Sequence, residues 1–266
     1  MKLSVITVVL NGEKHIKQCI ESVVSQKTND VEYIIVDGGS TDGTLEIIRS
    51  FEPLIDRIIS EPDHGIADGF NKGIQLSTGD VIGFINADDW MEEGAVAHLL
   101  NRTDQADIYY ARMRVWMTEK RSFVATADHN QLRIKMTLNH PSVFVNRSVY
   151  EVLGGFNAYY SVAMDYEFLL RALASECEFS DSKYILTNMR WGGVSDKEWI
   201  KGIKEVRRAK DEMLGPSWLH VFDAMKQVLE TGASRWLLQS AFAGLFARYR
   251  SRYSSLPKFE ETRIRE

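Results

Sequence analysis

The sequence predicts an α/β fold in which helices flank a mostly parallel sheet, followed by a helical extension at the C-terminal end. Over residues 3–100, short apolar runs typical of strands covered on both faces alternate with segments whose apolar residues recur at helical spacing. Strand–helix alternation of this kind implies parallel strands joined by right-handed crossovers. The length of 266 residues, 44% of them hydrophobic, fits one large domain or a domain with an appendage.

Each expected element of the first half has its own pattern. The run 3–9 is rich in β-branched residues and is broken by Asn11-Gly12, and the apolar residues of 16–24 then follow at helical spacing. Thr41 or Asp42 is a suitable N-cap for the next helix. The expected order is therefore strand 3–9, helix 16–24, strand 32–36, helix 45–51, strand 57–60, helix 67–76 and strand 81–85.

The second half of the chain is expected to mix strands and helices less regularly. A β-hairpin from 108–112 through 123–125 joins the two halves, and the apolar run 143–145 predicts a further strand. The expected helices begin near 163, cover 199–213 before the break at Gly215-Pro216, and then cover 221–229 and 235–253. We therefore divide the chain into a domain of residues 1–215, with halves 1–100 and 101–215, and a helical extension 216–266.

Composition excludes several classes of protein. The formal net charge of −5 argues against nucleic acid as the main partner. Cys19 and Cys177 are too few for a disulfide framework and lack metal-ligand spacing, so a reducing, cytoplasmic setting is expected. The N-terminal residues lead straight into a strand without the apolar core of a signal peptide, and no apolar stretch is long enough to span a membrane.

The segment Asn86-Ala87-Asp88-Asp89-Trp90 places two carboxylates directly after the apolar run 81–85. Aspartate is disfavoured in strands and is rarely buried unless it is paired or binds a metal. Ligands of α/β folds bind at the carboxyl edge of the sheet, so the pair favours a hard cation, Mg²⁺ or Mn²⁺, that bridges to substrate phosphates. The alternative is a turn in which an aspartate caps a helix from Glu92 onward.

Acidic groups also follow two other expected strands, at Asp37 and Asp63. Gly38 and Gly39 let the backbone come close to a ligand or turn with positive φ, although Asp37-Gly38-Gly39-Ser40 also fits a plain turn and cap. The first strand is not followed by the glycine pattern of dinucleotide-binding folds, and the sequence has no P-loop motif.

Four segments follow one another in a distinctive order and spacing: 4–9, Asp37-Gly38-Gly39-Ser40-Thr41-Asp42-Gly43-Thr44, Glu61-Pro62-Asp63-His64-Gly65-Ile66-Ala67-Asp68-Gly69-Phe70-Asn71-Lys72-Gly73 and Asn86-Ala87-Asp88-Asp89-Trp90. In this order and spacing they resemble the family 2 glycosyltransferases, which are inverting enzymes with the Rossmann-like GT-A fold. The resemblance extends to about Ser195. Asn86 stands where a D-x-D motif would have its first carboxylate, which leaves Asp88 as the implied metal ligand.

The resemblance implies a nucleotide-sugar donor site, most simply for a UDP-sugar. A divalent ion at Asp88 would neutralise the charge that grows on the diphosphate leaving group. Asp37 would contact the uracil or the ribose, while Asp89 would orient the donor sugar or only cap the following helix. Lys72 would contact the nucleotide or the diphosphate, and the alternative is a solvated lysine on a helix. The implied donor residues are Val8, Val9, Asp37, Asp63, Lys72, Asp88, Asp89 and Arg190, the last as a partner of phosphate.

The resemblance also implies a general base for the acceptor hydroxyl, an acidic residue near the start of a helix behind a Gly-Gly-Phe segment. Asp165 holds that position after Gly154-Gly155-Phe156, with Met164 where the family usually has Glu. The rival carboxylate is Glu167, and the simpler reading of Asp165 is a carboxylate that favours the helix dipole.

Two further residues are implied on the acceptor side. His140 precedes an apolar strand that the family places beside the active site, or it is a structural histidine bonded to backbone. Trp191 stacks on a sugar or packs on the core.

The predicted function is a metal-dependent, inverting hexosyl- or N-acetylhexosaminyltransferase of surface-polysaccharide biosynthesis, acting on a glycan acceptor that is lipid-linked. The alternatives are a nucleotidyltransferase and a non-catalytic protein that binds nucleotide sugars. The apolar run 236–247 leads into Arg248 and Tyr249, a pattern that fits an anionic membrane interface, packing on the catalytic domain, or contact with a second copy in a homo-oligomer. A location at the inner face of the cell membrane follows from the first of these.

Overall fold

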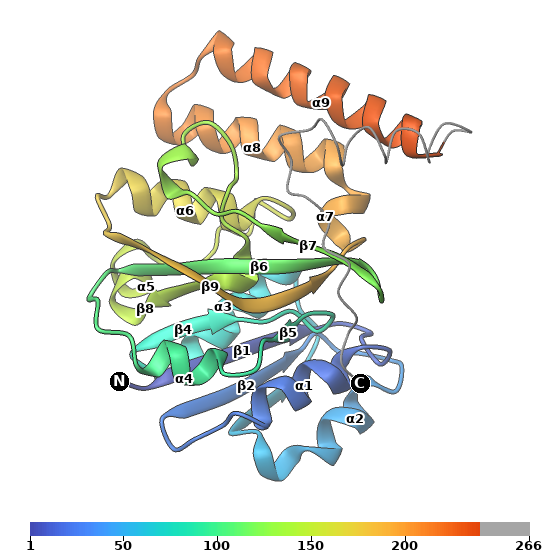
Figure 1. Ribbon diagram of the computed structural model, residues 1–266, viewed down its shortest axis with the longest axis vertical. Helices are drawn as coiled ribbons and strands as arrows, with labels where there is room; N and C mark the ends of the chain where they lie inside the picture. The colour runs from blue at the N-terminus through green and yellow to red at the C-terminus, as the bar shows by residue number, and fades with distance from the viewer. Residues whose placement is uncertain (240–266) are drawn as a thin grey trace.

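A nine-stranded sheet runs through the part of the protein that the computed structural model describes, residues 1–239, with backbone alone for 194–195 and 234–239 (Figure 1). Its strands are β1 (Leu3–Val9), β2 (Val31–Asp37), β3 (Arg57–Ser60), β4 (Val81–Phe84), β5 (Trp90–Met91), β6 (Ile108–Thr118), β7 (Arg121–Ala125), β8 (Val143–Asn146) and β9 (Phe179–Arg190). The strand order is β3-β2-β1-β4-β8-β6-β9-β5, and β7 pairs with β6.

The sheet is parallel in its first half and mixed in its second. β1, β2, β3 and β4 pair in parallel, as the strand–helix alternation predicts. β8 is antiparallel to both β4 and β6. β6 and β9 are parallel, whereas β6 with β7 forms the expected antiparallel hairpin. The predicted α/β class is confirmed, and the sheet is wholly parallel only across β1, β2, β3 and β4.

The helices lie on both faces of the sheet (Figure 1). Among the described residues they are α1 (Ile16–Val24), α2 (Thr44–Ser50), α3 (Ile66–Leu76), α4 (Ala95–Leu100), α5 (Arg147–Leu153), α6 (Met164–Ala174), α7 (Val194–Lys197), α8 (Trp199–Leu214) and α9 (Trp218–Gln239), together with three short 3₁₀ turns. One apolar cluster joins the sheet to α1, α2 and α4, and another joins it to α3, α5 and α6.

Side-chain alternation along the central strands sorts the core into these two clusters. Leu3 and Val5 of β1 contribute to the cluster with α1, while Ile6 contributes to the cluster with α3. Because successive strand residues point to opposite faces, a strand covered on both sides must be apolar throughout. This is why the sequence shows a continuous apolar run there and not an alternating one.

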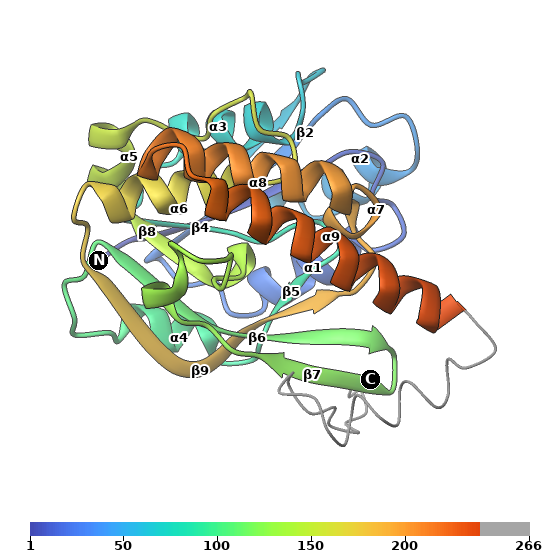
Figure 2. The ribbon, with the colours of Figure 1, turned by 90° about the horizontal axis from the view of Figure 1, so that it is seen from above.

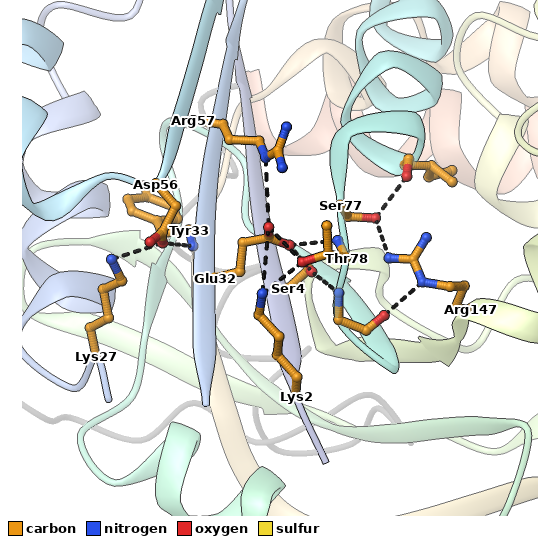
Figure 3. A network of polar contacts seen from close by, with 12 residues as sticks. Lys2, Ser4, Lys27, Glu32, Tyr33, Asp56, Arg57, Ser77, Thr78 and Arg147 are labelled. Atoms are coloured by element: carbon orange, nitrogen blue, oxygen red, sulfur yellow. Dashed lines mark hydrogen bonds and ion pairs between the residues drawn. The ribbon is translucent and has the colours of Figure 1, made fainter. Parts of the chain in front are cut away.

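The amino edge of the sheet is held by a polar network around Glu32 (Figure 3). The Glu32 carboxylate accepts hydrogen bonds from Ser4 Oγ at 2.6 Å and from the Thr78 N–H at 2.6 Å and Oγ1 at 2.8 Å, and it lies 3.7 Å from Lys2 Nζ and from Arg57 Nε. Burial by itself raises the pKa of Glu32, but these donors outweigh it and lower that pKa. The network ties β1, β2 and β3 to the loop before β4, at the end opposite the acidic loops.

Two expected helix caps differ from the structure. α2 begins at Thr44 and its N-cap is Gly43, not Thr41 or Asp42, while Asp42 Oδ1 accepts from the Thr44 N–H at 3.0 Å. The expectation that an aspartate of the 88–89 pair caps a helix from Glu92 is wrong, because β5 intervenes and α4 begins at Ala95 with Gly94 as its N-cap. Both aspartates of the pair are therefore free of a capping role.

The C-terminal helices stack on α6 in the order α6, α8, α9 (Figures 1 and 2). The two predicted helices 221–229 and 235–253 are wrong in their division, because α9 runs unbroken from Trp218 to Gln239. Gly232 lies within this helix facing Trp199, and packing against α8 compensates for its low helix propensity of about 1 kcal/mol. The rest of the second predicted helix lies outside the described residues.

None of the helices in the described part of the chain is both long and apolar enough to cross a bilayer. The division of the chain at residues 100 and 215 stays a prediction.

Candidate active site

The register of the parallel strands gathers the predicted donor residues at one edge. Val9 of β1 pairs with Asp37 of β2, and Asp37 pairs with Ser60 of β3, so three strands end side by side. Ile6 pairs with Phe84, which brings the 86–90 segment next to the loop after β1. A Cβ on Gly12 of that loop would lie 3.4 Å from Ala87 Cβ. The edge is thus continuous from β3 to β4, as a ligand crevice of this fold class requires.

Asp37 is fully buried and connects the loop after β2 to the end of β3. One of its carboxylate oxygens accepts from Ser40 Oγ at 2.5 Å and the other from Ser60 Oγ at 2.6 Å, while the Ser40 N–H lies 3.2 Å from both. The side chain therefore holds the loop 38–43 against the end of β3. Its implied contact with a nucleoside stays a prediction.

Asp63 lies in a niche built from glycines. A Cβ added to Gly38 would meet Asp63 Oδ2 at 2.4 Å, and one added to Gly69 would lie 2.6 Å from Val8 Cγ1 and 3.5 Å from Asp63 Oδ2. Any side chain at either glycine would thus displace the carboxylate or Val8. The structure brings together Val8, near the end of β1, and Asp63, from the loop before α3, two of the residues that the resemblance implies for the donor site.

Lys72, on α3, is neither free nor simply solvated. Its Nζ lies 2.9 Å from Glu61 Oε1 and 3.3 Å from Asp68 Oδ2, and it donates to the Pro62 carbonyl at 3.3 Å. Glu61 first, and then Asp68, raise the pKa of the lysine, which keeps it positive. A phosphate contact would require Lys72 to leave one of these carboxylates.

The Asp88–Asp89 pair has the features of an incomplete cation site. Asp88 is half-buried, whereas Asp89 is 1% exposed, with Oδ2 accepting from Asn86 Nδ2 at 3.0 Å and with no partner for Oδ1 among the described residues. Burial first, and then the charge of Asp88, raise the pKa of Asp89 well above its ordinary value. A buried carboxyl with a free oxygen beside a second carboxylate fits a divalent ion.

The described residues hold no group of three or more side chains that could ligate a metal by themselves. Mg²⁺ sites commonly use one or two carboxylates, with the remaining positions filled by substrate phosphates and water. The donor set of Asp88 and its neighbour is compatible with that kind of site.

Arg190 crosses from the end of β9 to the acidic pair. Its guanidinium donates to the Asp88 carbonyl and to the Gln18 side chain, and it lies 4.5 Å above the Trp90 ring. The glycine-rich segment after it follows the same path, since a Cβ on Gly193 would lie 3.9 Å from Asp88 Oδ2. Arg190 therefore lies at the acidic pair, where the sequence predicts a diphosphate.

Trp191 is 50% exposed, so it does not pack into the core. Its backbone N–H donates to the Trp116 carbonyl at 2.9 Å, which fixes the backbone and leaves the ring at the surface. An exposed indole can stack on a sugar ring, and this contact stays a prediction.

Two residues of this region, His15 and Gln18, are missing from the sequence prediction. Gln18 is the acceptor for Arg190. The pKa of His15 is lowered by burial and by the charges of Arg190 and Lys14, while the charge of Asp88 acts in the opposite direction. A polar side chain at the start of a helix that follows the first strand is the feature that could have identified them.

The acceptor half is joined to this edge by Asn71 of α3. Its Oδ1 accepts from the Phe156 N–H at 2.7 Å, and its Nδ2 donates to the Phe156 carbonyl at 2.8 Å. A Cβ on Gly155 would lie 2.1 Å from Asn71 Oδ1, which explains the second glycine of the Gly-Gly-Phe segment. Sequence reasoning missed this link because it connects residues 85 positions apart.

Asp165 occupies the first turn of α6, which begins at Met164. Its Oδ1 accepts from the Tyr166 N–H at 2.8 Å. Burial raises the pKa of Asp165 to about 6, and the charge of Glu205 adds to this rise, while the Tyr166 N–H opposes it. A carboxyl that titrates near neutral pH is suited to accept a proton from a hydroxyl group.

Glu167, the rival carboxylate, has a different role. It is 2% exposed, and its two oxygens each lie 3.0 Å from the Arg171 guanidinium. Arg171 in turn donates to the carbonyls of Leu153 and Gly155. The pair fastens α6 to the Gly-Gly-Phe segment, so Glu167 is a structural anchor.

His140 lies within an aromatic cluster, with its ring centroid 5.0 Å from that of Phe70, 5.3 Å from that of Phe84 and 5.5 Å from that of Phe156. Burial lowers its pKa to about 4, so the ring is neutral at neutral pH. Its Nε2 has no hydrogen-bond partner among the described residues. The cluster bridges the donor and acceptor halves, and the predicted contact of His140 with an acceptor stays untested.

Known proteins match both the sequence and the fold. A family model described as glycosyl transferase family 2 covers residues 4–160. A PGL/p-HBAD biosynthesis glycosyltransferase of Mycobacterium bovis is 30% identical over 211 residues, which cover 74% of this chain and 82% of the relative.

Among solved structures, S. aureus TarS 1-349 in complex with UDP-GlcNAc matches with a TM-score of 0.62 and 16% identity, covering 96% of this chain and 77% of that one. The mannosyltransferase PcManGT from Pyrobaculum calidifontis, in complex with GDP-Man and Mn²⁺, matches with a TM-score of 0.64 and 14% identity, covering 96% and 83%. These neighbours confirm the predicted GT-A fold. Together with the family match, they place this chain among the family 2 glycosyltransferases: it belongs to that family and is a glycosyltransferase enzyme.

Proposed function

We propose that this enzyme transfers a hexosyl or N-acetylhexosaminyl group from a UDP-sugar to a glycan acceptor, with a divalent ion and with inversion at the anomeric carbon. The observation that carries the proposal is the presence of two carboxyl sites with different surroundings. Asp88 and Asp89 lie at the sheet edge beside Arg190, and Asp165, with a pKa of about 6, lies at the start of α6. The first pair suits a charged leaving group, and Asp165 suits a proton transfer.

The donor half of the proposal assigns each strand-end residue a binding role. Asp63 and the backbone at Val8 and Val9 would contact the nucleoside, with Asp37 holding the loop beneath it. Mg²⁺ or Mn²⁺, held by Asp88, would supply charge neutralisation for the diphosphate when bound. Two structural neighbours, one in complex with UDP-GlcNAc and one with GDP-Man and Mn²⁺, support a nucleotide-sugar donor and a divalent ion.

The charged side chains around the diphosphate would complement the ion. Arg190 would pair with a phosphate oxygen, because its guanidinium already reaches the Asp88 carbonyl and lies over the Trp90 ring. Lys72, on α3, would bind a phosphate oxygen after its ammonium group leaves Glu61 or Asp68. Asp89, buried beside Asp88, would help to orient the donor sugar.

In the proposed reaction, the acceptor hydroxyl oxygen attacks the anomeric carbon from the face opposite the diphosphate. The bond between that carbon and the diphosphate oxygen breaks, and the proton of the hydroxyl moves to an Asp165 carboxylate oxygen. The products are the inverted glycoside and UDP. The pKa of about 6 keeps Asp165 mostly ionised at neutral pH and makes it a stronger base than a carboxylate with an ordinary pKa. Trp191 would stack on the acceptor and His140 would support the same side.

The acceptor is proposed to be lipid-linked, in the biosynthesis of a surface polysaccharide at the inner face of the cell membrane. Support comes from α9, where four exposed apolar residues recur on one helix face, a set that we call the α9 ridge: Trp218, Phe222, Met225 and Leu229. Their exposed fractions are 74%, 59%, 62% and 71%. In the sequence the ridge leads into the apolar run 236–247 and then into Arg248, which favours an anionic lipid surface over a second copy.

We expect the double substitution Trp218→Ser with Phe222→Ser to weaken binding of the full chain to vesicles that contain phosphatidylglycerol. Each buried aromatic side chain contributes about 1.5–3 kcal/mol, so the loss should be at least about tenfold in co-sedimentation. Val152→Ser, at an apolar residue on α5 that is 81% exposed, is the matched control. Equal binding of all three proteins would exclude the lipid surface, and a change in sedimentation coefficient alone would favour a homo-oligomer.

The test of the whole proposal is a screen of nucleotide sugars by thermal shift with Mn²⁺, followed by detection of released UDP and of glycosylated acceptor. A bound donor stabilises the fold by mass action, so the correct nucleotide should raise Tm. Release of pyrophosphate in place of UDP would indicate a nucleotidyltransferase. Donor binding without any release would indicate a non-catalytic protein that binds nucleotide sugars.

A further inference from the structure

The backbone just before α6 is held by hydrogen bonds to a side chain of α8. The N-cap of α6 is Ala163, and no side chain of the local sequence caps the helix. Instead the Glu205 carboxylate of α8 accepts from three successive backbone N–H groups, at 2.8 Å from Val162, 2.9 Å from Ala163 and 3.1 Å from Ser161. It also accepts from Ser161 Oγ at 3.1 Å. A carboxylate within three consecutive N–H groups is an anion in a backbone nest.

The fold is shaped to bring this carboxylate to the loop. Glu205 is 9% exposed and lies one turn after Gly202 on α8. A Cβ on Gly202 would lie 3.1 Å from Val162 Cγ1, so the glycine allows α8 to approach residues 161–163 closely. The contact is thus built into the packing of α8 on α6 and is not a chance meeting of surface side chains.

We propose that Glu205 is a positioning residue for the catalytic base: from α8 it holds the backbone of residues 161–163, so that the first turn of α6 presents Asp165 to the acceptor. The proposal rests on the role of Asp165 as the base in the proposed function. It assigns α8 a direct part in preparing the acceptor side of the site, although no motif of the family lies in that helix.

The charge of Glu205 has a second effect on the base. Burial by itself raises the pKa of Glu205, but the N–H groups of Ala163, Val162 and Ser161 outweigh it and lower that pKa, so the carboxylate stays ionised. A permanent negative charge on α8 disfavours ionisation of the neighbouring Asp165, and it contributes to the raised pKa of the base. Glu205 therefore positions Asp165 and adds to the rise in its pKa that burial causes.

Several charged groups lie on the helices packed against α6 and on α6 itself. They are Lys201, Lys204, Glu205, Arg207, Arg208, Lys210, Asp211 and Glu212 on α8, Arg147 and Glu151 on α5, and Glu167 with Arg171 on α6, while Asp223 lies on α9, which packs on α8. Of these groups, Glu205 is the one whose charge raises the pKa of Asp165.

The test compares pH–rate profiles of full-length variants at saturating donor. We expect Glu205→Gln to lower kcat by about ten- to a hundredfold, since a small displacement of a reacting group is enough for such a loss, while the donor KM stays within about twofold. Its acid limb should move to lower pH, because Asp165 loses a like-charged neighbour and ionises more easily. Glu205→Asp keeps the charge but shortens the side chain, so kcat should fall while the acid limb stays in place.

Glu212→Gln is the matched control. Glu212 lies two turns after Glu205 on the same helix and accepts from Tyr160 Oη at 2.6 Å, without contacting residues 161–163. It should leave both kcat and the acid limb near the wild-type values. If Glu205→Gln does not fold, Glu205→Asp carries the test, and a wild-type kcat in that variant overturns the proposal.

The failure of this proposal is distinct from the failure of the proposed function. An active Asp165→Asn enzyme would remove the base itself, whatever Glu205 does. An inactive Asp165→Asn enzyme together with an unmoved acid limb and an unchanged kcat in Glu205→Gln would overturn the role of Glu205 alone. A proportional rise of donor KM in Glu205→Gln would also overturn it, because the disturbance would then extend to the donor site.

Discussion

Asp165→Asn is expected to lower turnover by two to four orders of magnitude, the usual contribution of a positioned general base. Asparagine keeps the size of the side chain and can still accept from the Tyr166 N–H, but it cannot take the proton of the acceptor hydroxyl. The wild-type pH–rate profile should lose activity as the pH falls through about 6, because protonation of Asp165 then removes the base. The variant should lack this acid limb, and its affinity for the donor should not change.

Glu167→Gln is the comparison for this experiment, measured well below its melting temperature. Removing one partner of the buried pair with Arg171 should lower stability by roughly 3–5 kcal/mol, while the chemical step in the folded enzyme continues. A folded Glu167→Gln enzyme without activity, beside an active Asp165→Asn enzyme, would mean that Glu167 is the base.

Asp88→Asn is expected to lower the affinity for UDP by about tenfold or more, the equivalent of 1.4 kcal/mol. Two adjacent carboxylates repel a diphosphate unless a cation intervenes, and Asp89 is already the partner of Asn86. Calorimetry of UDP binding with Mn²⁺ measures the effect, and removal of the ion with EDTA should reproduce it in the wild-type protein.

Asp30→Asn, at an exposed aspartate before β2, is the control for the loss of one negative charge. It lies at the amino edge of the sheet, away from the acidic pair, and should bind UDP as the wild-type protein does. Undiminished UDP binding in EDTA would exclude a metal-bridged donor site. Equal losses of UDP affinity in Asp30→Asn and Asp88→Asn would mean that only the net charge of the protein matters.

Local patterns in the sequence were sufficient for the first half of the fold. β1 and β4 form where the sequence has continuous apolar runs, and α1 forms where apolar residues recur at helical spacing. Each pattern can be recognised locally because it reflects which faces of the element are buried. The parallel order of these strands follows from chain connectivity, and it brings Asp37, Asp63 and Asp88 to one edge without further information. The candidate donor residues could therefore be predicted from their places after the strands.

Contacts between distant parts of the chain decided the rest, because neither partner of such a contact carries a local pattern. Examples are the pairing of β6 with β9, the Asn71 link to Phe156 and the unbroken path of α9 across Gly232. The support of Glu205 for residues 161–163 spans more than 40 positions and depends on how α8 packs on α6. By itself the sequence determined which residues are candidates for the chemistry, through their types and their places at strand and helix ends. Only the tertiary structure decided how Asp165, the proposed base, is held and in which direction its pKa is shifted, because burial and neighbouring charge depend on the packing of elements that are distant in the chain.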